Sequence, residues 1–291
     1  MEIEEIMSAK PQWLRRRLPP MGKNSQIQRL VDDHMLHTVC VEAHCPNQME
    51  CYGRGEATFL LLGPSCSRRC TFCTVDKSTV KAPDANEPLH IADAVAKMAL
   101  KHAVLTMVTR DDLNDGGAAH IVRTVQAIRA VAPAAAIELL ISDLAGNWEA
   151  LTHVMASQPQ VLNHNVETVP RLYPTVRPQA DYHRSIELLR RAAAHRPELV
   201  TKSGLMLGLG ETRDEVLRVL DALRQSNCRL LTIGQYLAPS SRHHPVIRYI
   251  PPDEFADYMY EAYSRGFSGV ASSPFVRSSY QAGKLYHSIH S

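Results

Sequence analysis

Six of the seven cysteines of this 291-residue chain lie in one short stretch, residues 40–73. They form two groups of three, separated by an apolar run at residues 57–62. The first triad is Cys40, Cys45 and Cys51, and the second triad is Cys66, Cys70 and Cys73. Closely spaced thiolates are ligands for zinc and for iron–sulfur clusters. Two triads therefore indicate two metal centres.

The spacing within each triad favours iron over zinc. Structural zinc sites use paired ligands, such as two Cys-x2-Cys units, because the ion requires a closed tetrahedron. Neither triad completes such a set. A [4Fe–4S] cluster takes four ligands, so three thiolates leave its last iron open. An open iron can bind a substrate, and we expect a reaction there.

The composition limits the class of protein. Apolar residues make up 45% of the chain and can fill a substantial core, either of one α/β barrel or of two domains. A formal charge of +2 argues against bulk attraction to nucleic acid or to an anionic membrane. The acidic start MEIEEIMSAK is neither a secretory signal nor an Arg-rich transit peptide. We expect a cytoplasmic protein, in which clustered cysteines are metal ligands rather than a disulfide framework.

From residue 57 onward, apolar runs alternate with amphipathic segments, a pattern typical of repeated βα units around a parallel sheet. Six units rather than eight predict an incomplete barrel, whose open side could admit a large substrate. The predicted strands are 57–62, 103–108, 135–141, 161–166, 201–207 and 230–235. The predicted helices are 90–101, 117–131, 148–156, 182–195, 211–225 and 253–265, with a short one at 25–37.

We divide the chain into three regions on this basis. Residues 1–55 form an N-terminal extension that carries the first triad, and residues 56–250 form the partial barrel. Residues 251–291 form a C-terminal helix and extension.

Polar segments follow three of the predicted strands, at the edge where parallel barrels carry their reactive groups. Residues 109–118, TRDDLNDGGA, put carboxylates and backbone amides at a helix start, although a plain acidic cap is the commoner reading of such charges. Residues 163–168, NHNVET, must either bond to one another or face a ligand if the strand is buried. Residues 202–212, KSGLMLGLGET, contain Gly208, which permits close approach of the backbone to a ligand.

Together these segments resemble the lipoyl synthase family of radical S-adenosylmethionine (SAM) enzymes. The second triad, with Phe72 before its last cysteine, is similar to the cluster loop of radical SAM enzymes. The first triad is similar to the auxiliary-cluster segment of that family. The segments at 109–118, 163–168, 171–178, 202–211 and 277–280 also resemble family patterns. Val41, Pro64 and Ser67 depart from the usual residues, at positions that are not ligands.

The resemblance implies a partial (β/α)6 TIM-type barrel with N- and C-terminal extensions, which holds two [4Fe–4S] clusters and SAM. The second triad would bind the cluster that cleaves SAM. The first triad would bind the auxiliary cluster, with Ser279 as its fourth ligand and Ser278 as the alternative. The residues expected near SAM are Phe72, Thr109, Asp111, Asp112, Asn163, Asn165, Glu167, Arg171 and Gly208.

The reaction implied by the resemblance is insertion of two sulfur atoms at C6 and C8 of a protein-bound octanoyl-lysine. Unactivated C–H bonds offer no acidic proton and no leaving group, so a radical cofactor must supply the chemistry. The implied partners are an octanoylated lipoyl carrier domain or H protein and an electron donor of the flavodoxin or ferredoxin type. We expect a monomer that binds neither nucleic acid nor a membrane.

Two alternatives stay open at this stage. A biotin synthase-like enzyme also inserts sulfur, but it would lack the upstream Cys-x4-Cys-x5-Cys triad. An iron–sulfur electron carrier or a zinc-stabilised binding module would not catalyse a reaction, and neither needs the polar strand end at 163–168.

Overall fold

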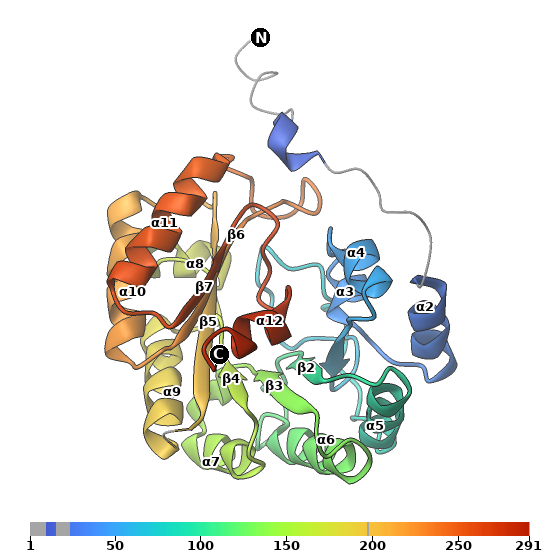
Figure 1. The fold of residues 1–291 in the computed structure, drawn as a ribbon. Helices are drawn as coiled ribbons and strands as arrows, with labels where there is room; N and C mark the ends of the chain where they lie inside the picture. Colours follow the sequence, from blue (N-terminus) through green and yellow to red (C-terminus); the bar gives the residue numbers. More distant parts are fainter. Residues whose placement is uncertain (1–9, 16–23, 197, 291) are drawn as a thin grey trace.

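The computed structural model describes residues 10–15, 24–196 and 198–290, so parts of the predicted N-terminal extension lie outside the described residues. Seven parallel strands form one sheet in chain order (Figure 1). The strands are β1 (Thr58–Leu61), β2 (His102–Met107), β3 (Ala136–Leu140), β4 (Val161–Asn163), β5 (Val200–Leu207), β6 (Leu230–Gln235) and β7 (Gly269–Ser272). Within the described chain β1 and β7 do not pair, so the barrel is open. This confirms the predicted partial barrel.

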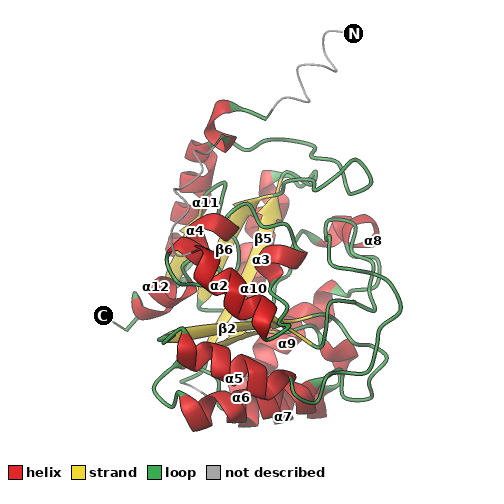
Figure 2. Ribbon diagram, turned by 90° about the vertical axis from the view of Figure 1, so that its right-hand side faces the viewer, coloured by secondary structure: helices red, strands yellow, loops and turns green. Residues whose placement is uncertain are grey.

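Helices cover the outside of the sheet, while shorter elements from both ends of the chain lie near its open side (Figures 1 and 2). The outer helices are α5 (Glu87–Lys97), α6 (Ala118–Val131), α7 (Trp148–Ala156), α9 (Tyr182–His195), α10 (Arg213–Gln225) and α11 (Pro252–Ser264). The N-terminal extension holds η1 (Gln12–Leu14), α2 (Asn24–Asp33), α3 (Val39–Glu42) and α4 (Gln48–Gly53). The remaining short helices are η2 (Leu144–Gly146), η3 (Pro170–Leu172), α8 (Tyr173–Val176) and α12 (Ala282–His287). None of the described helices is long and apolar enough to cross a membrane.

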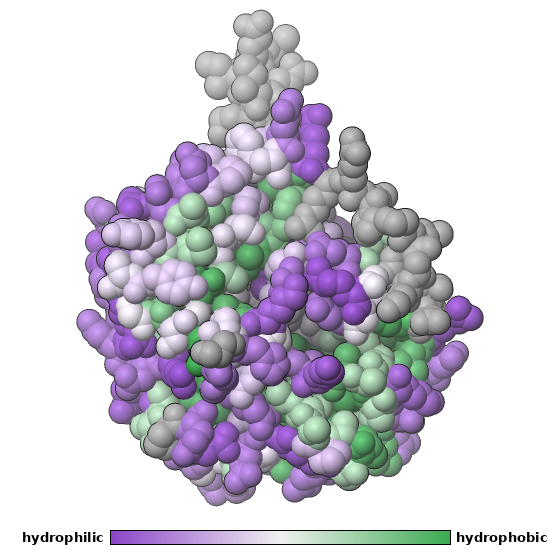
Figure 3. Space-filling model, in the orientation of Figure 1, coloured by the Kyte–Doolittle hydropathy of each residue, from purple (hydrophilic) through white to green (hydrophobic). Residues whose placement is uncertain are grey.

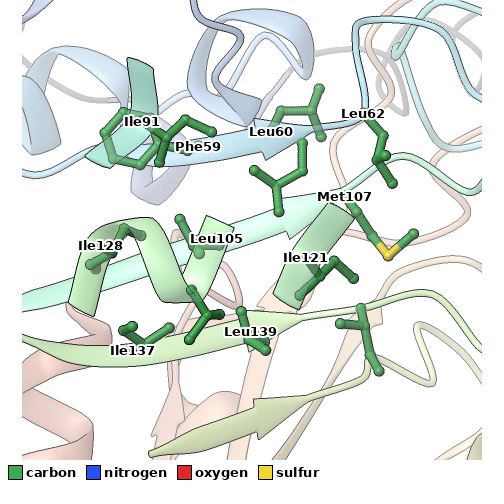
Figure 4. Close-up of a cluster of buried hydrophobic side chains, with 14 of the residues drawn as sticks. Phe59, Leu60, Leu62, Ile91, Leu105, Met107, Ile121, Ile128, Ile137 and Leu139 are labelled. Carbon is green, nitrogen blue, oxygen red and sulfur yellow. The ribbon is translucent and has the colours of Figure 1, made fainter. Parts of the chain in front are cut away.

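The core lies between the sheet and the outer helices. Every residue of β1 is buried, as expected for a parallel strand that is covered on both faces. Phe59, Leu105 and Ile137 on successive strands lie beside Ile91 of α5 and Ile128 of α6 (Figure 4). These contacts fix the strand ends, and therefore the loops that carry the polar segments, relative to one another. On the outside, an apolar area over α5 and α6 is visible at the lower right of Figure 3.

The six predicted strands are all present, but the sheet contains a seventh that the sequence did not reveal. β7 has only four residues, Gly-Val-Ala-Ser, and two of them are too small to give a strand signal. The fourth strand is also shorter than predicted and ends at Asn163. Beyond it, Glu167 has a φ of 64°, which takes the chain out of the regular strand conformation.

The C-terminal helix α12 packs between β7 and β2 and fills part of the open side (Figure 1). The Tyr286 ring lies 5.6 Å from the His102 ring, centroid to centroid. A Cβ atom at Gly283 would lie 3.1 Å from the Cβ of His102, so this turn of the helix touches the start of β2 closely. The end of the chain is therefore anchored against the barrel.

A fully buried ion pair joins β3 to β5 inside this fold. The Lys202 Nζ lies 2.7 Å from Glu138 Oε1, and neither side chain is exposed. His102 Nε2 lies 3.2 Å from the other carboxylate oxygen of Glu138. Burial by itself raises the pKa of Glu138, but the Lys202 ammonium and His102 outweigh it and lower the pKa to about 2. Glu138 is therefore charged in the folded protein.

We expect Lys202→Met to lower the free energy of unfolding by about 3–5 kcal/mol, because it leaves a charged carboxylate buried without its partner. Adding Glu138→Leu should restore most of this loss. Because the pKa of Glu138 is depressed in the folded protein, ionised Glu138 adds to the free energy of unfolding. This stabilisation should be complete above the ordinary glutamate pKa of about 4.3 and should be lost as the pH falls towards 2. Denaturant unfolding followed by circular dichroism measures each variant. A single-variant loss below about 1 kcal/mol would contradict the assignment.

Candidate metal centres

The second triad lies in the loop that follows β1. The Cys66 N–H donates to the Asp76 carbonyl at 2.8 Å, which closes the loop around the three cysteines. Burial, with smaller contributions from Cys70 and Cys66, raises the pKa of Cys73 to about 12. The three cysteines of this loop therefore act electrostatically on one another. Metal binding would displace their protons, as thiolate coordination requires.

Among the residues that the structure describes, no three His, Cys, Asp or Glu side chains are arranged to hold a single metal ion. A four-iron cluster is larger than one ion and spreads its ligands more widely.

The loop after β2 supports the cluster loop through hydrogen bonds and an ion pair. The backbone N–H and the hydroxyl of Ser67 both donate to the Thr109 carbonyl at 2.9 Å. The buried Arg68 guanidinium binds Asp111 through two hydrogen bonds of 2.7 and 2.9 Å. Asp112 is paired with Arg110 at 2.7 Å. The structure thus gives all three predicted SAM residues of this loop a partner within the protein.

The polar side chains at the end of β4 have two different roles: some are bonded within the fold, and others lie at the candidate site. His164 points away from the barrel interior: its Nδ1 lies 2.9 Å from the Ile141 carbonyl oxygen and its Nε2 lies 3.0 Å from the Ser185 hydroxyl. Burial lowers the pKa of His164 to about 4, so the ring is neutral. By contrast, Asn165 Nδ2 donates to Glu167 Oε1 at 3.1 Å, while the buried Asn165 Oδ1 has no partner in the described structure. A buried acceptor of this kind is usually satisfied by an ordered water, an ion or a bound ligand.

The arginine that lies at this site is Arg177, which the sequence did not single out. Its Nη1 donates to the Asn165 carbonyl at 3.0 Å and to the Val166 carbonyl at 3.2 Å. Its buried Nε has no partner among the described atoms. Burial raises the pKa of Cys70, and the Arg177 guanidinium opposes this rise, which places the two side chains together. Only the likeness of residues 171–178 to the family pattern pointed to Arg177.

Arg171 lies outside this cluster. Its side chain is 55% exposed and its Nε lies 2.7 Å from Glu215 of α10. In this structure the arginine forms a surface ion pair, and its contact with SAM stays a prediction.

Gly208 and Phe72 have clear packing roles. Gly208 has a φ of 98°, and a Cβ atom there would overlap the Gln235 side chain and the Arg248 carbonyl. The glycine therefore lets the loop after β6 lie against the end of β5. Phe72 packs against the hydrophobic cluster of β5–β7. Direct SAM contact by either residue stays a prediction.

The first triad spans α3, the turn after it and α4. Burial raises the pKa of Cys40 to about 11. Burial also raises the pKa of Cys51 to about 12, and the nearby Cys40 and Cys45 sulfurs add to this effect. The three thiols of this triad therefore also act electrostatically on one another.

The C-terminal segment packs directly on the first triad. The Asn47 side-chain Nδ2 donates to the Phe275 carbonyl at 2.7 Å. The Tyr280 hydroxyl donates to Glu50 at 2.8 Å, and the Arg54 guanidinium lies 5.3 Å above the centre of the Tyr280 ring. Nothing in the local sequence of Asn47 or Glu50 indicates partners more than 220 residues away.

The backbone between these two contacts is tightly held. A Cβ atom at Gly234 would overlap the Val276 carbonyl, so only a glycine allows the segment to lie on β6. Ser278 and Ser279 follow immediately, and their hydroxyls make no hydrogen bond within the described residues. Either serine is therefore available as a ligand.

Comparison with known proteins agrees with this geometry. The Radical SAM superfamily pattern matches residues 60–223. The lipoyl synthase of Trichlorobacter lovleyi is 53% identical over 274 residues, which cover 94% of this chain and 97% of that protein. The lipoyl synthase of Desulfotalea psychrophila is 50% identical over 283 residues, which cover 97% and 95% of the two chains.

The fold is also similar to that of solved structures with little sequence identity. HydG, a maturase of the [FeFe]-hydrogenase, aligns with a TM-score of 0.59 at 14% identity, covering 86% of this chain and 63% of that one. Methylornithine synthase aligns with a TM-score of 0.55 at 12% identity, covering 91% and 73%. The sequence relatives confirm the resemblance seen in the motifs, and this chain belongs to the lipoyl synthase family of the radical SAM superfamily.

Proposed function

We propose that this enzyme inserts two sulfur atoms, at C6 and C8, into an octanoyl-lysine that is carried by another protein. The observation that carries the proposal is that two separate cysteine triads flank one barrel edge, with residues 275–280 packed on the first triad. The implied reactants besides SAM are the protein-bound octanoyl chain and an electron donor.

In this proposal Cys66, Cys70 and Cys73 hold a [4Fe–4S] cluster that binds SAM at its open iron. When bound, these groups supply one-electron cleavage of SAM, which yields a carbon radical able to remove hydrogen from an unactivated C–H bond. The chain itself must bind, orient and shield these groups.

The unpartnered atoms at the end of β4 fit the amino-acid end of SAM. The Arg177 Nε is a free buried donor that suits a carboxylate, and the Asn165 Oδ1 is a free buried acceptor that suits an ammonium group. Glu167, which accepts from Asn165, adds a carboxyl group beside the same space. We therefore assign these three side chains to SAM, and Asp111 and Asp112 to the support of the loop.

Such polar atoms distinguish a catalyst from an electron carrier. A carrier needs only a shielded cluster, and orphaned buried polar groups beside it would be a cost without a use. The pair at Asn165 and Arg177 therefore favours a ligand-binding enzyme over the non-catalytic alternative.

The first triad is the proposed holder of a second [4Fe–4S] cluster, with Ser279 as fourth ligand. The packing of Tyr280 on Glu50 and Arg54 supports this assignment, because it brings the neighbouring serine to the α4 side of the barrel mouth. A serine oxygen is a harder ligand than a thiolate and a poorer match for cluster iron. Such a mixed ligand set suits a cluster that is opened to give up sulfur.

Anaerobically purified enzyme should contain about eight irons and a matching amount of sulfide per chain, as two four-iron clusters require. Iron and acid-labile sulfide analysis measures both. Zinc in place of iron would contradict the proposed metal centres.

Cys70→Ala should abolish 5′-deoxyadenosine formation while the first triad still assembles its cluster, because only the second triad presents an open iron to SAM. Cys228→Ala is the matched control, since Cys228 is buried in the core beside β6. Product analysis and iron content test the two variants. Formation of 5′-deoxyadenosine at the normal rate by Cys70→Ala would show that the triads are assigned the wrong way round.

Ser279→Ala should disrupt sulfur insertion while SAM cleavage continues slowly. Ser279→Cys should retain the auxiliary cluster but slow the formation of lipoyl product, because a thiolate holds iron more tightly. The same two substitutions at Ser278 form the control series. Lipoyl product at the normal rate from Ser279→Cys would argue against a role for a labile ligand.

A further inference from the structure

The loop between β6 and α11, residues 236–251, forms part of the rim of the barrel mouth. It follows β6 and therefore lies at the same edge as the second triad. In Figure 1 it extends from the upper end of β6 before the chain enters α11. The backbone N–H of His244 donates to the Thr71 carbonyl at 3.0 Å, so this rim loop touches the cluster loop between Cys70 and Cys73.

Hydrogen bonds to the ends of β5 and β6 hold the rim loop, although several of its residues are exposed. The Ile247 N–H donates to the Gly208 carbonyl at 2.8 Å, and the Tyr236 hydroxyl donates to the His244 carbonyl at 2.7 Å. The buried Gln235 side chain bonds the loop twice, through the Arg248 carbonyl at 3.1 Å and the Ile250 N–H at 2.8 Å. A surface that is already ordered loses little entropy when a partner binds.

Unpaired positive charge is concentrated beside this contact. Arg242 is exposed and forms no ion pair with any described residue, whereas Arg248 of the same loop is paired with Glu254. Arg69, two residues before Thr71, is likewise exposed, and the described chain offers it no ion-pair partner. His243 and His244 follow Arg242 directly and are half-buried.

The same loop also carries an exposed apolar side chain. Ile247 is 48% exposed, although the backbone around it is fixed. Protein interfaces commonly combine an apolar anchor with arginines, and charged rims govern the rate of association. We call Arg69, Arg242, His243, His244 and Ile247 the rim patch.

We propose that the rim patch is the docking surface for the carrier protein, and that it recognises an acidic surface around the octanoyl-lysine. This rests on the proposed function, because an acyl chain on a lysine arm reaches the cluster only if its carrier binds at the mouth. The contact between the rim loop and Thr71 means that a carrier bound there lies beside the loop that holds the reacting groups. The positive charge of the rim patch selects a partner of opposite sign.

The test compares Arg242→Glu with the unmodified enzyme on two substrates, with dithionite as the reductant. One substrate is an octanoylated lipoyl carrier domain with an acidic surface, and the other is a short neutral peptide with one octanoyl-lysine. The variant should lose on the order of fivefold in kcat/KM for the domain at low salt, through KM, because charge reversal slows steered association. The loss should shrink at high salt. The kcat/KM of the variant for the peptide should stay within about twofold of that of the unmodified enzyme, because a charge on the rim does not touch the octanoyl-lysine.

Two further variants control for charge and for fold. Arg242→Lys keeps the charge and should retain normal activity on the domain. Arg218→Glu makes the same reversal on the outer helix α10, where Arg218 is exposed and unpaired within the described residues, and should have little effect. Direct binding of the octanoylated domain, measured by calorimetry in the absence of SAM, should weaken only for Arg242→Glu.

Three results would overturn the docking proposal. The first is an equal loss of kcat/KM by Arg242→Glu on the domain and on the peptide. The second is unchanged binding and unchanged kcat/KM of Arg242→Glu for the domain at low salt. The third is a defect that appears only with a flavodoxin-type reductant, which would assign the rim patch to the electron donor instead. Failure of the proposed function gives a different result, since the unmodified enzyme would then make no thiolated product from either substrate.

Discussion

The opening between β1 and β7 is the constraint on which the arrangement of this molecule depends. Within the described chain the seven strands do not close, so the sheet has two edges that other parts of the chain must cover. The N-terminal extension packs α3 against β1, and α12 packs against β7 and β2. Both ends of the chain are thereby brought to the same side. The contact between Asn47 and Phe275 follows from this shared position.

The period of the β-strand explains how one short segment serves both the core and the site. Alternate residues of an extended chain face opposite sides. Asn163 and Asn165 face the barrel interior, where Asn163 donates to Glu138 and both side-chain oxygens have no partner among the described atoms. His164 faces outward and bonds Ser185 of α9. The polar residues at this strand end therefore serve two purposes: His164 joins the strand to α9, and the asparagines face the barrel interior.

Features that depend on local spacing could be predicted from the sequence, and features that depend on tertiary burial could not. The six predicted strands are encoded over a few residues each, and all six are present, although the fourth is shorter than predicted. The contacts of Arg177 were not encoded in this way, because its positions next to Asn165 and Cys70 depend on how the chain folds after β4. The same is true of Tyr280, whose partner Glu50 lies 230 positions earlier.

The contacts of Asn47 and Glu50 with the C-terminal segment can form only late in the synthesis of the chain. Synthesis proceeds from the N-terminus, so the first triad leaves the ribosome long before Phe275 and Tyr280 exist. The second triad and Arg177 are complete once the first four βα units have emerged. The first triad keeps an uncovered side until the last fifteen or so residues are made, and any group loaded there must be held or protected through that interval.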